Sequence, residues 1–279
     1  MRSITGCLAL SLLSVIQPVC ASAGTVNFVY LSPSDKAYRE DYNSAIETAV
    51  SDLTGWLAAN LDGHRLNTSE VVWRQTENPA AYYRGDGSDP ADQYQFWNYV
   101  LQDAFETTGG RFYDPENVWI YYIDADPNPG QTVGGGAGVA LMPANELRGL
   151  AGEPLVPIDP GDSTDNTGFD RGVGVLGHEL GHALGLPHPP GSPGGVFDYS
   201  LMYYGYLNFP NTYLRDVEKE HLLASGFFSD PAPVPLPLSG WMLSAGLLSL
   251  FWLRRPVGPS VRKLAHVSMK RIHVSNSEC

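Results

Sequence analysis

The chain has 279 residues, of which 43% are hydrophobic and only three are cysteines. A chain of this length and composition can bury a sizeable core without crosslinks, as one large domain or two small ones. Its formal net charge is −13, and so acidic a surface argues against nucleic acid or an anionic lipid surface as a partner.

Residues 1–23 have the pattern of a secretory signal peptide. Arg2 supplies the positive flank, residues 4–19 are mostly apolar, and Ala21-Ser22-Ala23 fits the small-x-small cleavage pattern. The alternative is an N-terminal membrane anchor, which is less consistent with a short apolar run that contains Pro18. We therefore expect an exported protein whose mature chain begins after Ala23.

The mature chain alternates between strand-like and helix-like patterns. Alternating apolar residues predict strands, and apolar residues at helical spacing predict amphipathic helices. In chain order we expect a strand at 25–31, a helix from Ser34 or Asp35 to about Asn60, a short strand near Val71, a helix at about 93–107, a central strand at 117–125, a glycine-led strand at 134–143, a short helix at 145–150, a helix at 171–184 and a last helix within 215–228. This order predicts an α/β or α+β domain over residues 24–230.

Three of the seven histidines lie within residues 177–190, in the stretch GHELGHALGLPHPP. On a helix, His178 and His182 lie on the same side, four residues apart, so that both imidazoles can reach one ion. The apolar residues of this helix, such as Leu176 and Leu180, lie on the other side. The pattern predicts a helix that packs with one face and holds a metal with the other.

A third ligand has to come from beyond the helix. His188 would point the wrong way if the helix continued, but Gly185 can adopt the left-handed conformation that ends a helix, and Pro187 stops it. A catalytic Zn²⁺ takes three protein ligands and keeps one position open. We therefore predict one zinc ion on His178, His182 and His188, with Glu179 beside the open position as the general base that accepts a proton from water.

The spacing HExxHxxGxxH resembles that of the metzincin metalloproteases. Ser200-Leu201-Met202-Tyr203-Tyr204 is similar to the Ser-x-Met-x-Tyr turn that lies beneath the zinc in astacins and serralysins. The resemblance implies a twisted mixed sheet, an active-site helix and a smaller C-terminal subdomain that carries the Met-turn. It also implies zinc endopeptidase activity on a protein or peptide substrate, which would bind along an edge strand that we place at residues 134–143. The alternative for this segment is an ordinary hairpin strand.

The same resemblance suggests a role for one tyrosine. In families with this turn, the second residue after the methionine approaches the zinc and can donate a hydrogen bond to the reacting oxygen. Tyr204 holds that position, whereas we expect Tyr203 to point into packing or solvent. The alternative is that both rings, with Tyr206, only pack around the substrate pocket.

A second, calcium ion is possible in principle, but the sequence pattern does not support a calcium-binding loop. Asp124-Ala125-Asp126-Pro127-Asn128 begins like a calcium-binding loop, but Pro129 stands where such a loop needs glycine and Gly135 where it needs glutamate. Four further histidines have no evident partner and are expected at the surface: His64, His221, His266 and His273.

The C-terminal region predicts a membrane span. A proline-rich spacer at 231–235 precedes eighteen uncharged residues at 236–253, which is just long enough to cross a bilayer core, and Arg254-Arg255 follows. A buried core helix is the alternative. Val234-Pro235-Leu236-Pro237, the apolar run and the arginines resemble the sorting signals of exosortase substrates, although a basic tail continues over 254–279.

This arrangement implies a location. The arginines should stay cytoplasmic, so that the domain lies outside the inner membrane, at its periplasmic face, at the cell surface or released after processing by an exosortase-type enzyme. Two other functions remain open for such a protein. One is a non-catalytic surface binding protein of the same fold, for which Glu179 has no evident use. The other is a zinc amidase that acts on a non-protein amide.

Overall fold

The structure is a computed structural model that describes residues 23–85, 93–131, 133–157, 168–190 and 198–231. Its centre is a five-stranded sheet in the order β3-β1-β4-β6-β5. Four strands run parallel, namely β1 (Thr25–Ser32), β3 (Thr68–Gln75), β4 (Asn117–Ile123) and β6 (Val139–Met142), and β5 (Gly134–Gly136) is antiparallel to β6. The mixed α/β class is confirmed, and β4 is the central strand, as predicted.

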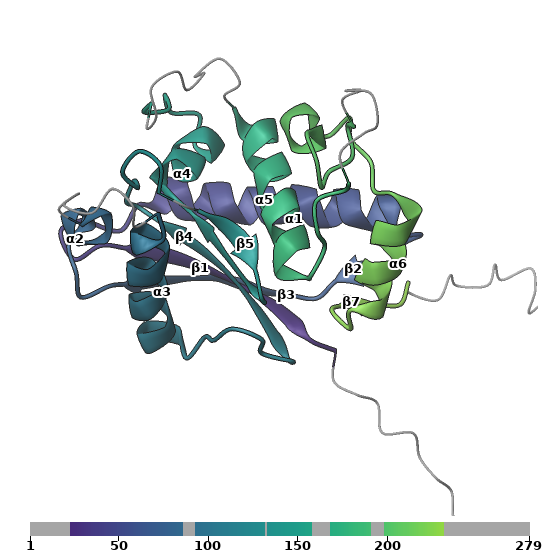
Figure 1. The fold of residues 1–279 in the computed structure, drawn as a ribbon, viewed down its shortest axis with the longest axis horizontal. Helices are drawn as coiled ribbons and strands as arrows, with labels where there is room; N and C mark the ends of the chain where they lie inside the picture. The colour runs from purple at the N-terminus through teal and green to yellow at the C-terminus, as the bar shows by residue number, and fades with distance from the viewer. Residues whose placement is uncertain (1–22, 86–92, 132, 158–167, 191–197, 232–279) are drawn as a thin grey trace, which may run out of the picture. The chain divides into compact units, whose positions relative to one another are not determined.

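Helices cover both faces of the sheet (Figure 1). On one face, α1 (Glu40–Asn60), α4 (Ala144–Leu150) and α5 (Phe169–Ala183) share a core with alternate strand residues such as Phe28 and Ile120. On the other, α2 (Ala80–Arg84) and α3 (Gln95–Thr108) pack on the intervening residues, such as Val29 and Tyr121. In β1, β4 and β6, successive residues therefore serve opposite cores, which explains why these three strands are largely apolar.

The C-terminal part of the described chain is a short subdomain. It comprises a 3₁₀ turn η1 (Gly205–Asn208), helix α6 (Asp216–Ala224) and strand β7 (Phe228–Ser229). Strand β7 pairs antiparallel with β2 (Arg65–Leu66). This pairing and the hydrogen bond from Gly24 N to Gly226 O tie the end of the domain to its beginning.

Helix α1 begins later than the sequence predicts. The expected start was Ser34 or Asp35, but the helix begins at Glu40. The carboxylate of Asp35 instead accepts a hydrogen bond of 2.8 Å from the backbone N–H of Ala80, the first residue of α2. A residue type that favours helix N-termini thus stabilises the start of another helix, distant in sequence.

The glycine-led segment at 134–143 is two strands rather than one. Its chain reverses at Ala137 and Gly138, whose φ values are 54° and 86°. Two consecutive residues with positive φ form the tight turn that suits a two-residue hairpin. The segment therefore places β5, and not β6, at the edge of the sheet.

Both predicted targeting segments, 1–23 and 236–253, lie outside the described residues, apart from position 23. Within the described ranges, no helix combines the length and apolar character that a membrane span requires.

Candidate functional site

Helix α5 carries the site because its two sides differ in chemistry. Val173, Leu176 and Leu180 are almost completely buried in the core shared with α1 and the sheet. His178 and His182 lie on the other side, as the helical spacing predicts. Packing of the apolar side holds the backbone of the helix in place, so the two imidazoles project from a rigid element.

The helix ends in the glycine turn that was predicted. Gly185 has a φ of 95°. Its N–H donates to His182 O at 3.0 Å, and the N–H of Leu186 donates to Gly181 O at 2.8 Å. This pair of hydrogen bonds is the Schellman arrangement, which turns the chain sharply and satisfies the last carbonyls. As a result, His188 comes back beside the helical histidines.

The three predicted ligands converge on one point. Their Nε2 atoms lie 3.1 Å apart for His178 and His182, 3.1 Å for His178 and His188, and 3.0 Å for His182 and His188. Two nitrogens bound to one tetrahedral Zn²⁺ at about 2.0–2.1 Å lie about 3.3 Å apart. The spacing fits an ion on the three histidines, which form the sole cluster of metal-ligand type among the described residues.

Backbone carbonyls orient two of these ligands. His178 Nδ1 lies 2.8 Å from Leu201 O, and His182 Nδ1 lies 2.7 Å from Leu186 O. A carbonyl only accepts hydrogen bonds, so each Nδ1 carries the proton and each neutral ring presents its lone pair at Nε2. Burial, aided by the neighbouring histidines, also lowers the pKa of His178 to about 4. The ring is therefore neutral near pH 7 and ready to bind a metal.

The predicted Met-turn lies directly beneath the histidines. Met202 is fully buried, and its Sδ lies against Gly181, where an added Cβ would approach it to 2.3 Å. Only glycine at this position lets the turn come so close to the helix. The preceding residue, Leu201, supplies the carbonyl that orients His178. The turn therefore supports the ligands both by packing and by a hydrogen bond.

Glu179 lies between the histidines and the edge strand. The backbone of β5 runs so close to α5 that a Cβ at Gly135 would lie 2.3 Å from Glu179 O, and one at Gly134 would lie 3.1 Å from a carboxylate oxygen. Burial, followed by the nearby carboxylate of Glu146, raises the pKa of Glu179 to about 7. A hydrogen bond from Gly135 N–H partly opposes this rise. The carboxylate is thus held beside the ligands, as predicted for a base.

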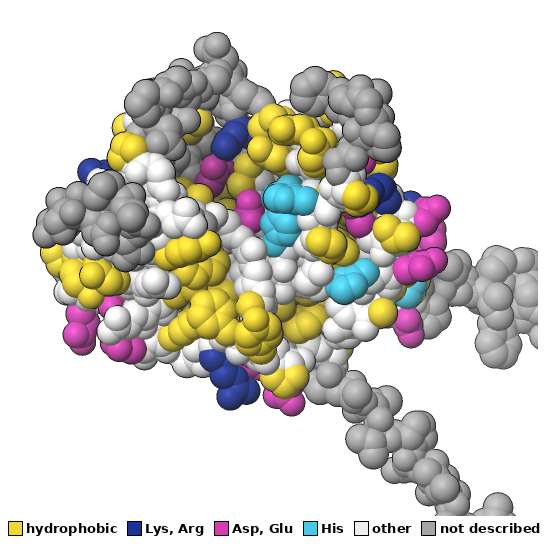
Figure 2. All heavy atoms as spheres, in the orientation of Figure 1, with side chains coloured by type: hydrophobic (Ala, Val, Ile, Leu, Met, Phe, Trp, Pro, Cys, Tyr) yellow, Lys and Arg dark blue, Asp and Glu magenta, His cyan; other side chains and the backbone are white. Residues whose placement is uncertain are grey.

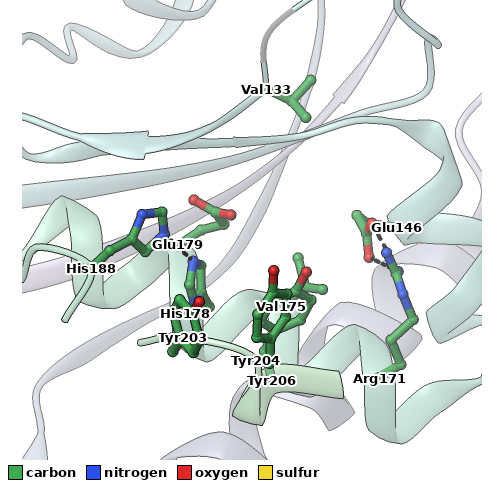
Figure 3. Close-up of a pocket in the computed structure, with 10 residues that line it drawn as sticks. All are labelled: Val133, Glu146, Arg171, Val175, His178, Glu179, His188, Tyr203, Tyr204 and Tyr206. Atoms are coloured by element: carbon green, nitrogen blue, oxygen red, sulfur yellow. Dashed lines mark hydrogen bonds and ion pairs between the residues drawn. The ribbon is translucent and has the colours of Figure 1, made fainter. Parts of the chain in front are cut away.

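A cleft of about 490 Å³ extends from the histidines along α5 (Figure 3). In Figure 2, histidine side chains gather near the middle of one molecular face, with acidic and basic side chains next to them. The cleft is lined by Val133, Glu146, Arg171, Val175, His178, Glu179, His188, Tyr203, Tyr204 and Tyr206. It brings two of the three predicted ligands, His178 and His188, and the predicted base into one cavity that is large enough for part of a peptide.

Three tyrosines after the Met-turn line this cleft. The ring centroid of Tyr206 lies 4.9 Å from that of His178, and the rings of Tyr203 and Tyr204 are 4.4 Å apart in an edge contact. Tyr203, expected in packing or solvent, is half-buried and lines the cleft. The approach of the Tyr204 hydroxyl to a reacting oxygen stays a prediction.

Sequence reasoning missed three polar residues around the site. Glu146 and Arg171 form an ion pair in the cleft wall. His221, expected to be a surface residue without a partner, donates from Nε2 to Leu184 O at 2.9 Å, at the end of α5. Arg171 stands seven residues before His178 and so on the same helix face, a signal that was available in the sequence. Glu146 and His221 come from other helices, and no pattern in the sequence linked them to the site.

In the segment compared with a calcium-binding loop, the carboxylate of Asp126 contacts arginine side chains. Both Nη atoms of Arg148 contact the carboxylate of Asp126, with Nη1 at 2.9 Å from Oδ1 and Nη2 at 2.5 Å from Oδ2. Arg84 lies 3.6 Å from the same carboxylate. Asp126 therefore belongs to an ion-pair cluster at the end of the central strand.

Comparison with known proteins identifies no family for this chain. No protein-family model matches it, and no curated protein is significantly similar in sequence. Among solved structures, catalytically inactive OgpA from Akkermansia muciniphila, in complex with an O-glycopeptide (glycodrosocin) substrate, is similar over 74% of this chain and 62% of that chain, at 18% identity and a TM-score of 0.49. Wild-type OgpA matches over 75% and 63%, at 20% identity and a TM-score of 0.48.

Metalloproteinase-II from Bacteroides fragilis is similar over 73% of this chain and 53% of that chain, at 17% identity and a TM-score of 0.41. The chain therefore spans less than two thirds of the length of each of these proteins. At this level of similarity, function has to be inferred from the site itself.

Proposed function

We propose that this protein is a zinc-dependent endopeptidase that hydrolyses peptide bonds with activated water. The observation that supports this most directly is the convergence of three histidine Nε2 atoms within 3.0–3.1 Å of one another, next to Glu179. Three imidazole nitrogens are the donor set of a catalytic zinc site that keeps one position open, and the neighbouring carboxylate stands beside that position.

Zn²⁺ in such a site supplies Lewis-acid chemistry, because it lowers the pKa of water and polarises a carbonyl group. The residues of the chain supply positioning and proton transfer. The carboxylate of Glu179 accepts a proton from the attacking water and passes it to the amine that leaves. The close backbone of β5 limits solvent around this carboxylate, so that the proton moves within the cleft.

A tyrosine and the edge strand contact the substrate in this proposal. In this proposal the Tyr204 hydroxyl donates a hydrogen bond to the oxygen that becomes negative during the reaction. Strand β5 forms the edge of the sheet beside Glu179, where an extended peptide can add as a further strand. A peptide bound in this way continues past the histidines. Cleavage would therefore fall within the peptide, as expected for an endopeptidase.

The decisive experiment compares cleavage with metal content. The zinc-loaded protein is incubated with a mixed peptide library, and the products are sequenced before and after zinc is removed with a chelator. Glu179→Ala should retain zinc and lose at least about 10²- to 10⁴-fold in hydrolysis, because it lacks the general base. Glu70→Ala, which removes an exposed carboxylate on β3, serves as the matched control.

Near-native cleavage by Glu179→Ala would refute the catalytic assignment. The same experiment separates the alternatives. A zinc-loaded protein that retains library peptides without cutting them would be a binding protein, whereas one that cuts only non-peptide amides would be an amidase.

A further inference from the structure

The cleft extends from the histidines to a polar end. Arg171 lies seven residues before His178 on α5, which places it on the same helix face and about 10 Å along the axis. Val175 lies between them on that face, and all three line the cleft. Figure 3 shows the Glu146–Arg171 pair at the opposite end of the cavity from His178, Glu179 and His188.

Among the described residues, this ion pair leaves some of its hydrogen-bonding groups without a partner. Arg171 Nη1 donates to both carboxylate oxygens of Glu146, at 2.9 Å and 2.7 Å. Nε and Nη2 of Arg171 make no hydrogen bond to any residue that the structure describes, although a guanidinium carries five N–H donors. The carboxylate oxygens of Glu146 likewise keep spare acceptor capacity. The pair therefore presents donors and acceptors side by side.

Glu146 and Arg171 are the two charged residues among the described ones that line this end of the cleft. The side chains of Arg171 and Glu146 are 22% and 11% exposed, so both charges are partly withdrawn from water. Their sum is zero. A charged group that approaches one partner meets a like charge on the other a few ångströms away. A neutral group that both donates and accepts satisfies both partners without this repulsion.

We propose that the Glu146–Arg171 pair is a specificity site that selects a neutral polar side chain, an amide or a hydroxyl, on the substrate. The inference rests on the proposed peptidase function and names the substrate class of the same cleft. An amide carbonyl accepts from Arg171, and the amide N–H₂ donates to Glu146.

The distance from the metal ligands limits which substrate residue reaches this site. An extended peptide advances about 3.3 Å per residue. About three residues of extended backbone span 10 Å, and the length of a long side chain covers part of that distance, so the selected side chain belongs to a residue one or two positions from the scissile bond. The selection should accordingly appear at one or two positions of the cleavage site, with the others unrestricted.

The test reverses the charge balance of the pair in both directions. The zinc-loaded full chain and its variants Glu146→Gln and Arg171→Gln are given matched peptides that differ only at those positions, with Gln, Ser, Glu, Lys or Leu. The wild type should prefer Gln and Ser. Glu146→Gln leaves Arg171 unpaired and should favour Glu over Lys by tenfold or more, whereas Arg171→Gln should favour Lys over Glu.

Peptide binding gives a second readout that does not depend on catalysis. The same peptides are titrated against each variant in a Glu179→Ala background, and dissociation constants are compared. If the protein cleaves nothing but binds with the predicted preferences, the peptidase proposal fails and the specificity site stands. If cleavage occurs with the same preferences in all variants, the specificity site is refuted and the peptidase proposal stands.

A purely structural role predicts a different result. If the pair only holds α4 to α5, both single variants should lower thermal stability and leave the order of preference unchanged, which would overturn the proposal. Should a single variant fail to fold, the double variant Glu146→Gln/Arg171→Gln keeps the site neutral and should again prefer Gln over Glu and Lys. Glu153→Gln, at an ion pair with Arg39 and outside the cleft lining, is the matched control and should keep the wild-type preference.

Discussion

Replacement of Gly185 tests whether the turn after α5 positions the third metal ligand. In Gly185→Ala, the new Cβ has to accept a φ of 95° and lies 3.1 Å from Nε2 of His221. That nitrogen donates to Leu184 O, so the methyl group disturbs a hydrogen bond as well as the backbone. The substitution acts on the turn that returns His188 to the site and replaces none of the three histidines.

The magnitude follows from these two contributions. A left-handed conformation costs an L-residue about 1–2 kcal/mol, and a lost intramolecular hydrogen bond costs about 0.5–1.5 kcal/mol. In the zinc-free protein the turn can relax and relieve this strain, whereas zinc binding requires the native turn. The combined cost of about 1.5–3.5 kcal/mol should therefore appear as a loss of zinc affinity of about tenfold to a few hundredfold. Gly185→Val should lose more, because a β-branched residue rarely adopts positive φ.

The assay is a zinc titration against a competing chelator, together with thermal unfolding of the zinc-free protein. Gly152→Ala is the matched control. Gly152 follows α4 with a φ of 72°, and the N–H of Glu153 donates to Arg148 O as in the turn after α5. An added Cβ there meets nothing within 4 Å. This control should lose stability by about 1–2 kcal/mol and keep its zinc affinity.

Wild-type zinc affinity in Gly185→Ala, alongside the expected destabilisation of Gly152→Ala, would refute the positioning role of the turn. The double variant Gly185→Ala/His221→Ala separates the cost of the backbone strain from the cost of the contact with His221. It removes the contact between the methyl group and the imidazole, so that any difference from Gly185→Ala reports that contact.

The remaining predictions concern the tyrosines and the C-terminal segment. Tyr204→Phe should lower kcat by a factor that corresponds to about 2–4 kcal/mol, with unchanged zinc content, because it removes a donor to the reacting oxygen. Tyr203→Phe should have a smaller effect, and a wild-type kcat in Tyr204→Phe would leave the tyrosines only a packing role. The full chain should fractionate with membranes, and a chain that ends at Asp230 should not. Equal solubility of both, with the full-length mass intact, would exclude a membrane span at 236–253.

Much of the candidate metal site could be predicted from the sequence, because its geometry is local. The spacing of His178 and His182 fixes their angle on any α-helix, and apolar residues of the same helix, such as Leu176 and Leu180, show which side packs. Gly185 marks the end of that helix because few residues other than glycine tolerate positive φ. These constraints act over a few residues, and the structure confirms them. The alternation of strands and helices was predictable for the same reason.

The tertiary structure decided the contacts between residues that are distant in sequence. Asp35 favours a helix N-terminus in any sequence, but only packing determined that it caps α2 and not α1. Glu146 and His221 reach the site from α4 and α6, and no local pattern distinguishes them from surface residues. Periodicity and backbone preferences specify which elements form and which of their sides are buried. Which side chains meet across the cleft depends on how the helices pack on the sheet, and that is a property of the whole chain.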